Sequence, residues 1–253
     1  MGIDLTRVAG GRAAAMGRSA VCEQGLWALQ NNVAGIAMLE GWHFGLYYEN
    51  LWLLKETAFK GAGITRSLHG IGCIGLSFSQ FGGSGYSENK LGVAFARSFG
   101  PYLQMGLQLD YLLLHWGEGY DSRGAFSFEL GIQSQVTERL RLGVYLFNPI
   151  QSRWKTLNED RLPIVLRFGL AYQFTEDFVG QLDVERDNSQ RGIHVRSGFE
   201  YVIFKKCCLR AGVQLNPNVF CFGVGYEWKG FHFDVSAQLH QAIGASIPLG
   251  INR

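Results

Sequence analysis

The feature that most constrains the fold of this chain is an alternation of apolar and polar side chains that returns along most of its length. In residues 199–215 (FEYVIFKKCCLRAGVQL), Phe199 and Tyr201 fall on one face while Glu200 and Arg210 fall on the other. An alternation with a period of two residues is typical of a β-strand whose two faces meet different surroundings.

The same alternation predicts strands from residue 42 to the end of the chain. Most of these segments are close to the about 9–11 residues that a tilted strand needs to cross a bilayer. We expect about fourteen of them, at 42–50, 55–67, 69–80, 89–99, 102–115, 124–137, 139–148, 163–175, 177–187, 191–204, 207–216, 219–229, 231–241 and 244–252.

The connections between these segments alternate in length. Every second one is tight: 68–70, 100–101, 137–138, 175–177, 205–206 and 229–230. The others are longer and more polar, as at 80–89, 116–123, 148–162 and 187–191. Short turns at one end and longer loops at the other are typical of an outer-membrane barrel, in which the short turns are periplasmic.

The two faces of the strands differ in charge. One face is uncharged over its middle, as in Leu103, Met105, Leu107, Leu109 and Tyr111, and a charge there would cost about 2–4 kcal/mol at the bilayer midplane. We expect the other face to form a luminal charge network of Asp110, Glu129, Arg141, Arg167, Asp183, Glu185, Arg196, Glu200, Arg210, Glu227 and Asp234. Tryptophans near strand ends are expected in the interfacial girdles (Trp42, Trp52, Trp116, Trp154 and Trp228).

The fold class expected from these patterns is all-β: a transmembrane antiparallel barrel of about fourteen strands. A soluble barrel or sandwich explains the alternation equally well, but it does not explain the sorted connections. Two register predictions follow. Glu200 faces Arg210 across the turn at Lys205-Lys206, and Arg167 lies near Glu185 across the turn at Glu176.

The first forty residues differ from the rest of the chain. They are rich in Ala and Gly, and residues 23–31 hold the one plausible helix. We expect residues 1–40 to form a plug inside the barrel or across its periplasmic mouth, and residues 41–253 to form the barrel. The plug residues singled out are Arg12, Trp27, Asn31 and Asn32.

Composition and motifs exclude several functional classes. A net charge of +2 offers no basic surface for a nucleic acid. His194, His232 and His240 could converge in the lumen with Asp234 and Ser236, but no G-x-S-x-G or H-E-x-x-H motif accompanies them. The five cysteines match no zinc spacing. We therefore expect no catalysis, no cofactor and no metal.

Short motifs at both ends of the chain resemble the PorV/PorQ group of Bacteroidota outer-membrane barrels, which is related to the FadL type. In that group an R-A-x-x-M/L-G segment precedes N-P-A-G-L-A. Here the corresponding residues are 11–17 (GRAAAMG) and 31–37 (NNVAGIA), with Val33 in place of the proline. The C-terminal matches are 198–201, 209–212, 220–225, 239–240 and 243–246, and the chain ends on Arg253 rather than on an aromatic residue.

The resemblance implies a FadL-like barrel in the bacterial outer membrane, with an N-terminal segment in its lumen. It implies either a non-catalytic accessory or scaffold subunit of an outer-membrane secretion or assembly complex, type IX or similar, or a FadL-like transporter of small hydrophobic molecules. We expect the first, with membrane lipid and other outer-membrane barrels or lipoproteins as partners. The transporter needs an apolar pocket inside, whereas the expected lumen is strongly polar. A small porin without a dedicated ligand is the third alternative.

Overall fold

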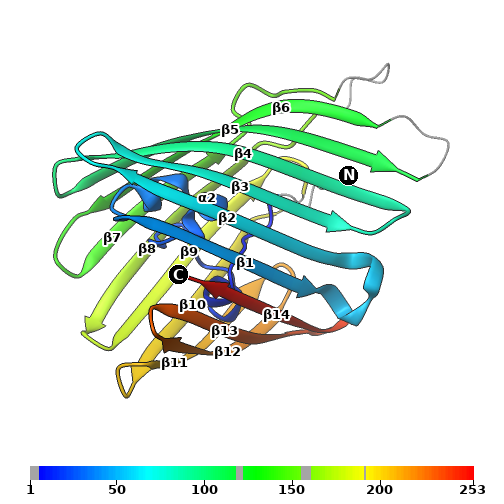
Figure 1. The fold of residues 1–253 in the computed structure, drawn as a ribbon. Coiled ribbons are helices and arrows are strands. Elements are labelled where there is room, and N and C mark those ends of the chain that lie inside the picture. Colours follow the sequence, from blue (N-terminus) through cyan, green and yellow to red (C-terminus); the bar gives the residue numbers. More distant parts are fainter. Residues whose placement is uncertain (1–5, 118–121, 155–160, 191) are drawn as a thin grey trace.

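The computed structural model describes residues 6–117, 122–154, 161–190 and 192–253. Over these residues the chain forms a closed antiparallel barrel in which each strand pairs with its neighbours in sequence and β1 pairs with β14 (Figure 1). The fourteen strands described are β1 (Trp42–Asn50), β2 (Ala58–Leu68), β3 (Gly72–Gly82), β4 (Tyr86–Phe99), β5 (Leu103–Trp116), β6 (Arg123–Gln135), β7 (Leu140–Phe147), β8 (Val165–Thr175), β9 (Phe178–Asp187), β10 (His194–Ile203), β11 (Cys207–Leu215), β12 (Val219–Trp228), β13 (Phe231–His240) and β14 (Gly244–Asn252).

The predicted strands and both predicted registers are confirmed. Glu200 pairs with Arg210, and Arg167 pairs with Glu185. All six tight turns lie at one end of the barrel, here called the turn end. The opposite end, the loop end, differs from expectation, because β3 and β4 continue to Gly82 and Tyr86 and leave only a short connection.

Residues 51–57 also depart from the prediction, which began the second strand at residue 55. They form two single turns of 3-10 helix, η3 (Leu51–Leu53) and η4 (Lys55–Thr57). Trp52 and Leu53 have φ of 53° and 57°, in the left-handed region that a strand does not contain. The backbone therefore leaves the sheet at the end of β1 and rejoins it at Ala58.

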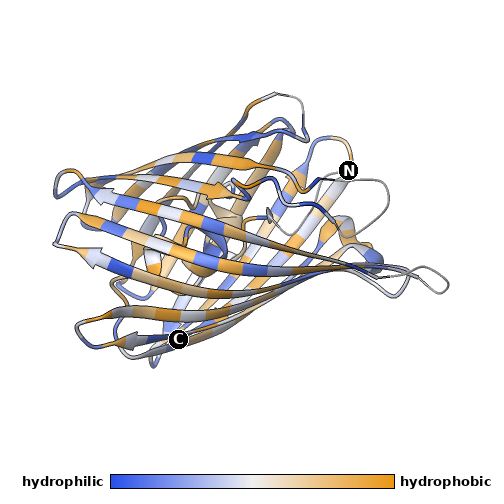
Figure 2. Ribbon diagram, turned by 90° about the horizontal axis from the view of Figure 1, so that it is seen from above, coloured by the Kyte–Doolittle hydropathy of each residue, from blue (hydrophilic) through white to orange (hydrophobic). Residues whose placement is uncertain are grey.

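The outer face of the wall is apolar. Leu107, Leu109, Phe126, Phe168 and Phe222 are all exposed on it, and hydrophobic and hydrophilic residues alternate along the strands nearest the viewer in Figure 2. Arg167, Glu129 and Asp110 point inward and are buried. The predicted division into a lipid-facing and a luminal face is thus present in the structure.

Residues 6–37 lie inside the barrel (Figure 1), and residues 1–5, which were also expected in the plug, fall outside the described part of the chain. Residues 6–37 contain α1 (Gly11–Ala15), α2 (Ala28–Asn31) and the 3-10 turn η2 (Val33–Ile36), and no described helix is long and apolar enough to cross a membrane. The wall has glycine residues where this plug approaches it. A Cβ atom added at Gly198 or Gly212 would lie 2.4 Å from a backbone atom of Met16, so these inward positions accept only glycine.

Candidate functional site

Ion pairs tie the plug to the wall near the turn end. Arg12 of α1 donates to Glu200 at 2.9–3.1 Å. Arg210 donates to the same carboxylate at 2.5 Å and also pairs with Asp234 of β13. The Glu200 carboxylate thus joins one arginine of the plug, Arg12, to one arginine of the wall, Arg210. Because these groups are largely removed from water, losing one partner would leave an uncompensated charge.

A second tie lies further toward the loop end. The Arg18 guanidinium donates to the Val8 carbonyl at 2.5 Å, to Glu49 of β1 at 2.5 Å and to Gln238 of β13 at 2.9 Å. Arg7 also donates to Glu49, at 3.0 and 3.2 Å. Since Arg18 is buried, this contact fixes the plug against strands on both sides of the β1–β14 seam.

The predicted plug residues occupy distinct positions. Trp27 is buried and packs edge-on against Tyr47, with ring centroids 5.8 Å apart. Asn31 exchanges two hydrogen bonds of 2.9 Å with the backbone of Ala9. Asn32 donates to the Val21 carbonyl at 2.8 Å and to wall carbonyls of β6 and β7 at 3.3 Å. Each of these side chains holds one part of the plug to another or to the wall.

The predicted charge network is divided into separate groups. Glu129 receives a hydrogen bond of 2.7 Å from Lys90, a buried lysine that the sequence analysis did not single out. Asp110 accepts from Gln108 at 2.9 Å. Asp183 accepts from the backbone amides of Ala20 and Val21, at 2.6 and 2.9 Å, and so holds the plug rather than a wall arginine.

Two members of the predicted network lie elsewhere. Glu227 is exposed next to the turn at Lys229, outside the buried network. Arg141 donates to Gln135 at 2.9 Å and to the Cys22 carbonyl at 3.4 Å. Alternation assigned both residues to the luminal face, but Glu227 is exposed and Arg141 is half-buried, so an inward position near the turn end is not always buried.

The histidines do not converge. His194 and His240 lie at the loop end, where both line one cavity, and His232 lies at the turn end beside a different cavity. The idea of a joint His–Asp–Ser site is therefore wrong. Over the described residues, no group of three or more His, Cys, Asp and Glu side chains is arranged to hold a metal ion.

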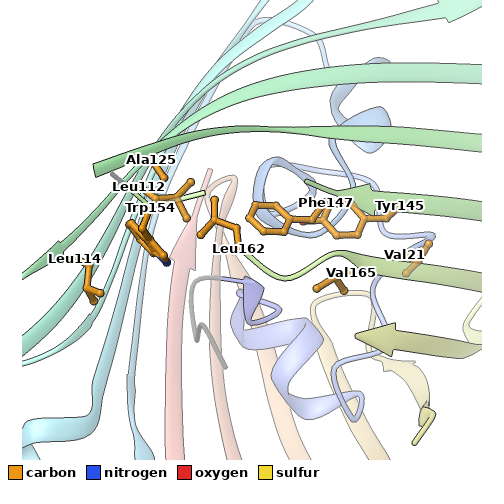
Figure 3. Packing of buried hydrophobic residues seen from close by; sticks show 9 residues of the cluster. All are labelled: Val21, Leu112, Leu114, Ala125, Tyr145, Phe147, Trp154, Leu162 and Val165. Carbon is orange, nitrogen blue, oxygen red and sulfur yellow. The ribbon is translucent and has the colours of Figure 1, made fainter. Parts of the chain in front are cut away.

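The lumen contains an apolar cluster that contradicts the expectation of a strongly polar interior. It lies toward the loop end on the inner side of β5–β8, and Tyr86 and Trp116 pack against it. We call this set the luminal apolar cluster (Figure 3): Val21, Leu112, Leu114, Ala125, Tyr145, Phe147, Trp154, Leu162 and Val165. The sequence did carry a signal for it, because residues 111–116 (YLLLHW) are apolar on both faces of β5.

Part of the luminal apolar cluster comes from the β7–β8 connection rather than from the wall. Trp154 and Leu162 belong to this connection and are buried. Buried Asn148 holds the connection in place, because its amide donates to the carbonyls of Leu162 and Pro163 at 3.0 and 3.1 Å and accepts from the Ser152 amide at 2.9 Å. Trp154 and Trp116 therefore lie inside the barrel and not in an interfacial girdle.

Charged groups border the luminal apolar cluster without carrying excess charge into it. The Lys90 ammonium lies 6.0 Å from the centre of the Phe147 ring, and the Arg167 guanidinium lies 4.9 Å from that of Tyr145. Lys90 is paired with Glu129 and Arg167 with Glu185. The cluster is thus a buried apolar region of the lumen, and the charged groups at its edge have partners within the protein.

Comparison with solved structures finds the same fold across almost the whole chain. The P. putida toluene transporter TodX has a TM-score of 0.73 at 13% identity, covering 96% of this chain and 97% of TodX. The Ralstonia pickettii toluene transporter TbuX has a TM-score of 0.66 at 15% identity, covering 96% of each chain. A Pseudomonas aeruginosa FadL homologue has a TM-score of 0.65 at 9% identity, covering 96% of this chain and 97% of the homologue.

Comparisons by sequence find no counterpart. No family model matches the chain, and no curated protein matches it. At identities this low the structural matches establish the fold alone. The chain has the fold of the FadL-type outer-membrane barrels, as the resemblance implied, and none of the matched structures named above is a PorV or PorQ protein.

Proposed function

We propose that this chain is a non-catalytic channel of the bacterial outer membrane that admits small hydrophobic molecules at the loop end of its lumen. The observation that carries this proposal is the luminal apolar cluster. A route for a hydrophobic guest needs apolar surface inside the lumen, and the cluster supplies apolar side chains on the inner side of β5–β8. The solved barrels with the same fold include structures described as toluene transporters, which supports the same function.

The composition of the cluster favours an uncharged guest. Tyr145, Phe147 and Trp154 supply flat apolar surface, and the adjoining Lys90 and Arg167 already have carboxylate partners. An anionic guest would have to compete with these carboxylates for the same cations. We therefore favour neutral hydrocarbons or similar small molecules over fatty acids.

Membership of the PorV/PorQ group and a scaffold role in a secretion complex stay predictions. One observation supports docking of another outer-membrane barrel or a lipoprotein. An apolar groove lies on the outer face of β10–β13, where Ala211 and Ala237 lie between larger side chains such as Phe199 and Phe222. Purification in mild detergent tests this function, because a scaffold would carry a stoichiometric partner and a channel would not.

Uptake of the hydrophobic dye N-phenylnaphthylamine by intact cells that produce the protein tests the channel proposal. Val165 is the first residue of β8 and lies in the luminal apolar cluster, while Val219 is the first residue of β12 and lines the polar cavity across the lumen. An unpaired amide in an apolar site costs about 1–3 kcal/mol, so Val165→Asn is expected to slow dye entry about fivefold or more.

Val219→Asn is the matched control, because it introduces the same group at the same depth on a polar part of the wall. We expect it to leave the rate of dye entry unchanged. Equal slowing by both variants, or an unchanged rate in Val165→Asn, would contradict the proposal. Surface abundance of each variant is measured in the same cells, so that a folding defect is not read as a loss of transport.

A further inference from the structure

The charged side chains around the outer edge of the turn end are separated into two groups. A basic group runs from β10 across the β14–β1 seam to β4. We call this group the basic rim, and its members are all exposed: Arg66, Arg97, Lys205, Lys206, Lys229 and Arg253. The other group lies at the β6–β7 and β8–β9 turns and is acidic on balance, with Arg139 beside Glu138, Glu176 and Asp177.

The basic rim lies beside the lipid-facing wall rather than over the mouth of the barrel. Arg66 comes two residues after exposed Ile64, and Arg97 comes two residues after exposed Phe95. Both arginines therefore continue the outer face of their strands, because side chains two residues apart in a strand share a face. The three lysines lie at the tips of the β10–β11 and β12–β13 turns. The positive charges thus begin where the apolar band of the wall ends.

Four members of the basic rim each lie over an aromatic ring of the outer wall. The distances from the cationic group to the ring centre are 4.9 Å for Arg66 on Trp42, 5.1 Å for Lys229 on Trp228, 5.5 Å for Arg253 on Phe231 and 5.9 Å for Arg97 on Phe99. Trp42 and Trp228 are 57% and 52% exposed. Exposed tryptophans at strand ends are typical of the membrane–water interface, so these cations lie at the level of the lipid headgroups.

The basic rim has no acceptor within the protein. Over the part of the chain that the structure describes, none of its six side chains forms an ion pair or donates a hydrogen bond. The loop end differs, because three of its cations donate to protein oxygens: Lys60 to Gln80 at 3.2 Å, Arg161 to Gln151 at 3.2 Å and Arg186 to the Gly192 carbonyl at 2.8 Å. Free donors are thus a property of the basic rim and not of every exposed cation.

Nearby carboxylates do not balance the basic rim. Glu40 precedes β1, Glu227 lies on the luminal face of β12, and both are exposed. With the terminal carboxylate of Arg253 they make three negative charges against the six positive ones. The luminal carboxylates Glu200 and Asp234 are already paired with arginines. A net positive charge therefore remains on this part of the turn end.

We propose that the basic rim binds the phosphate groups of anionic phospholipids in the periplasmic leaflet. Such a lipid carries acyl chains that lie against the apolar wall and a charged group at the level of the free cations, where basic side chains attract anionic lipid. A water-soluble acidic protein could reach the turn tips, but Arg66 and Arg97 point to the side of the wall, where lipid lies. This inference rests on the placement of the barrel in the membrane and not on the hydrophobic guest.

Electron paramagnetic resonance of the full chain in dioleoylphosphatidylcholine vesicles tests this interaction. The probes are spin-labelled phosphatidylglycerol and spin-labelled phosphatidylcholine, whose wall-bound fractions are compared. We expect the wild-type protein to favour phosphatidylglycerol about twofold or more, averaged over the wall. The triple variant Lys205→Gln, Lys206→Gln and Lys229→Gln is expected to lose about half of this preference or more.

The matched control is Lys60→Gln, Arg161→Gln and Arg186→Gln, which removes the same charge from the loop end and should keep the preference. A variant of opposite effect protects the test against misfolding. Glu176→Gln with Asp177→Asn removes negative charge beside the basic rim and should increase the preference. Equal association of both lipids with the wild-type protein, or equal loss in the two triple variants, would overturn the proposal.

Discussion

Glu23 is a buried carboxylate of the plug whose charge is only partly compensated. Its side chain accepts a hydrogen bond of 2.8 Å from Asn31, and Arg12 lies 3.7 Å away. Burial raises the pKa of Glu23 above its ordinary 4.5, although Arg12 acts in the opposite direction. The protonated form is therefore favoured by the folded plug more than by the unfolded chain.

The sign of this shift fixes a pH dependence. Because the folded pKa is raised, the stability that Glu23 contributes is fully present below pH 4.5 and is lost as the pH rises through the raised pKa. We expect hydrogen exchange in residues 9–36, corrected for its intrinsic pH dependence, to show less protection at pH 8 than at pH 5. Glu23→Gln should remove this difference, whereas Glu138→Gln, at an exposed position, should preserve it. A pH difference that persists in Glu23→Gln would contradict the assignment.

At the scale of single elements, the β7–β8 connection covers the luminal apolar cluster and depends on Asn148. This residue has φ of 55° and makes three hydrogen bonds to the connection through its side chain. Asn148→Gly keeps the left-handed backbone accessible and removes only these bonds, each worth about 0.5–1.5 kcal/mol.

We expect Asn148→Gly to loosen the connection and to increase dye entry about twofold or more, with surface abundance unchanged. Dye uptake by whole cells measures this, and proteolysis at Arg153 or Arg161 reports the loosening independently. Asn218→Gly, in the β11–β12 connection, removes a single exposed amide contact of 3.3 Å and serves as the control. Loosening without a change in dye entry would show that the connection does not control access.

The strands were predictable because alternation is a local property: the two faces of each strand read directly from the sequence. The luminal apolar cluster was not, since it depends on Leu112 and Leu114 meeting Phe147 and Trp154 from distant parts of the chain. Alternation also predicts which face of a strand a residue lies on, but not how deeply the residue is buried. For this reason Glu227 was assigned to a buried network, whereas its side chain is exposed. The plug was predictable as a non-strand segment, but its ion pair with Glu49 of the wall was not. The pairing of Lys90 with Glu129 within the wall was not predictable either.

At the scale of the whole molecule, the plug reaches both sides of the lumen. The α1 helix contacts β11–β14, and η2 contacts β4–β6. We therefore expect the purified protein to show no large, steady ohmic current in planar lipid bilayers.

Arg18→Gln should produce intermittent openings, because it removes the buried contacts of the plug with Glu49 and Gln238 of the wall. Arg186→Gln, which changes an exposed arginine of the wall, should stay closed like the wild-type protein. Large, steady currents from the wild-type protein would show that the plug does not close the lumen.

Anomalous diffraction from crystals soaked in bromobenzene tests most directly whether the loop-end half of the lumen accepts small hydrophobic molecules. We expect a bromine peak inside the barrel, in contact with Leu112, Phe147 or Trp154 of the luminal apolar cluster. Bromine peaks confined to the outer, lipid-facing wall, with none in the lumen, would contradict it.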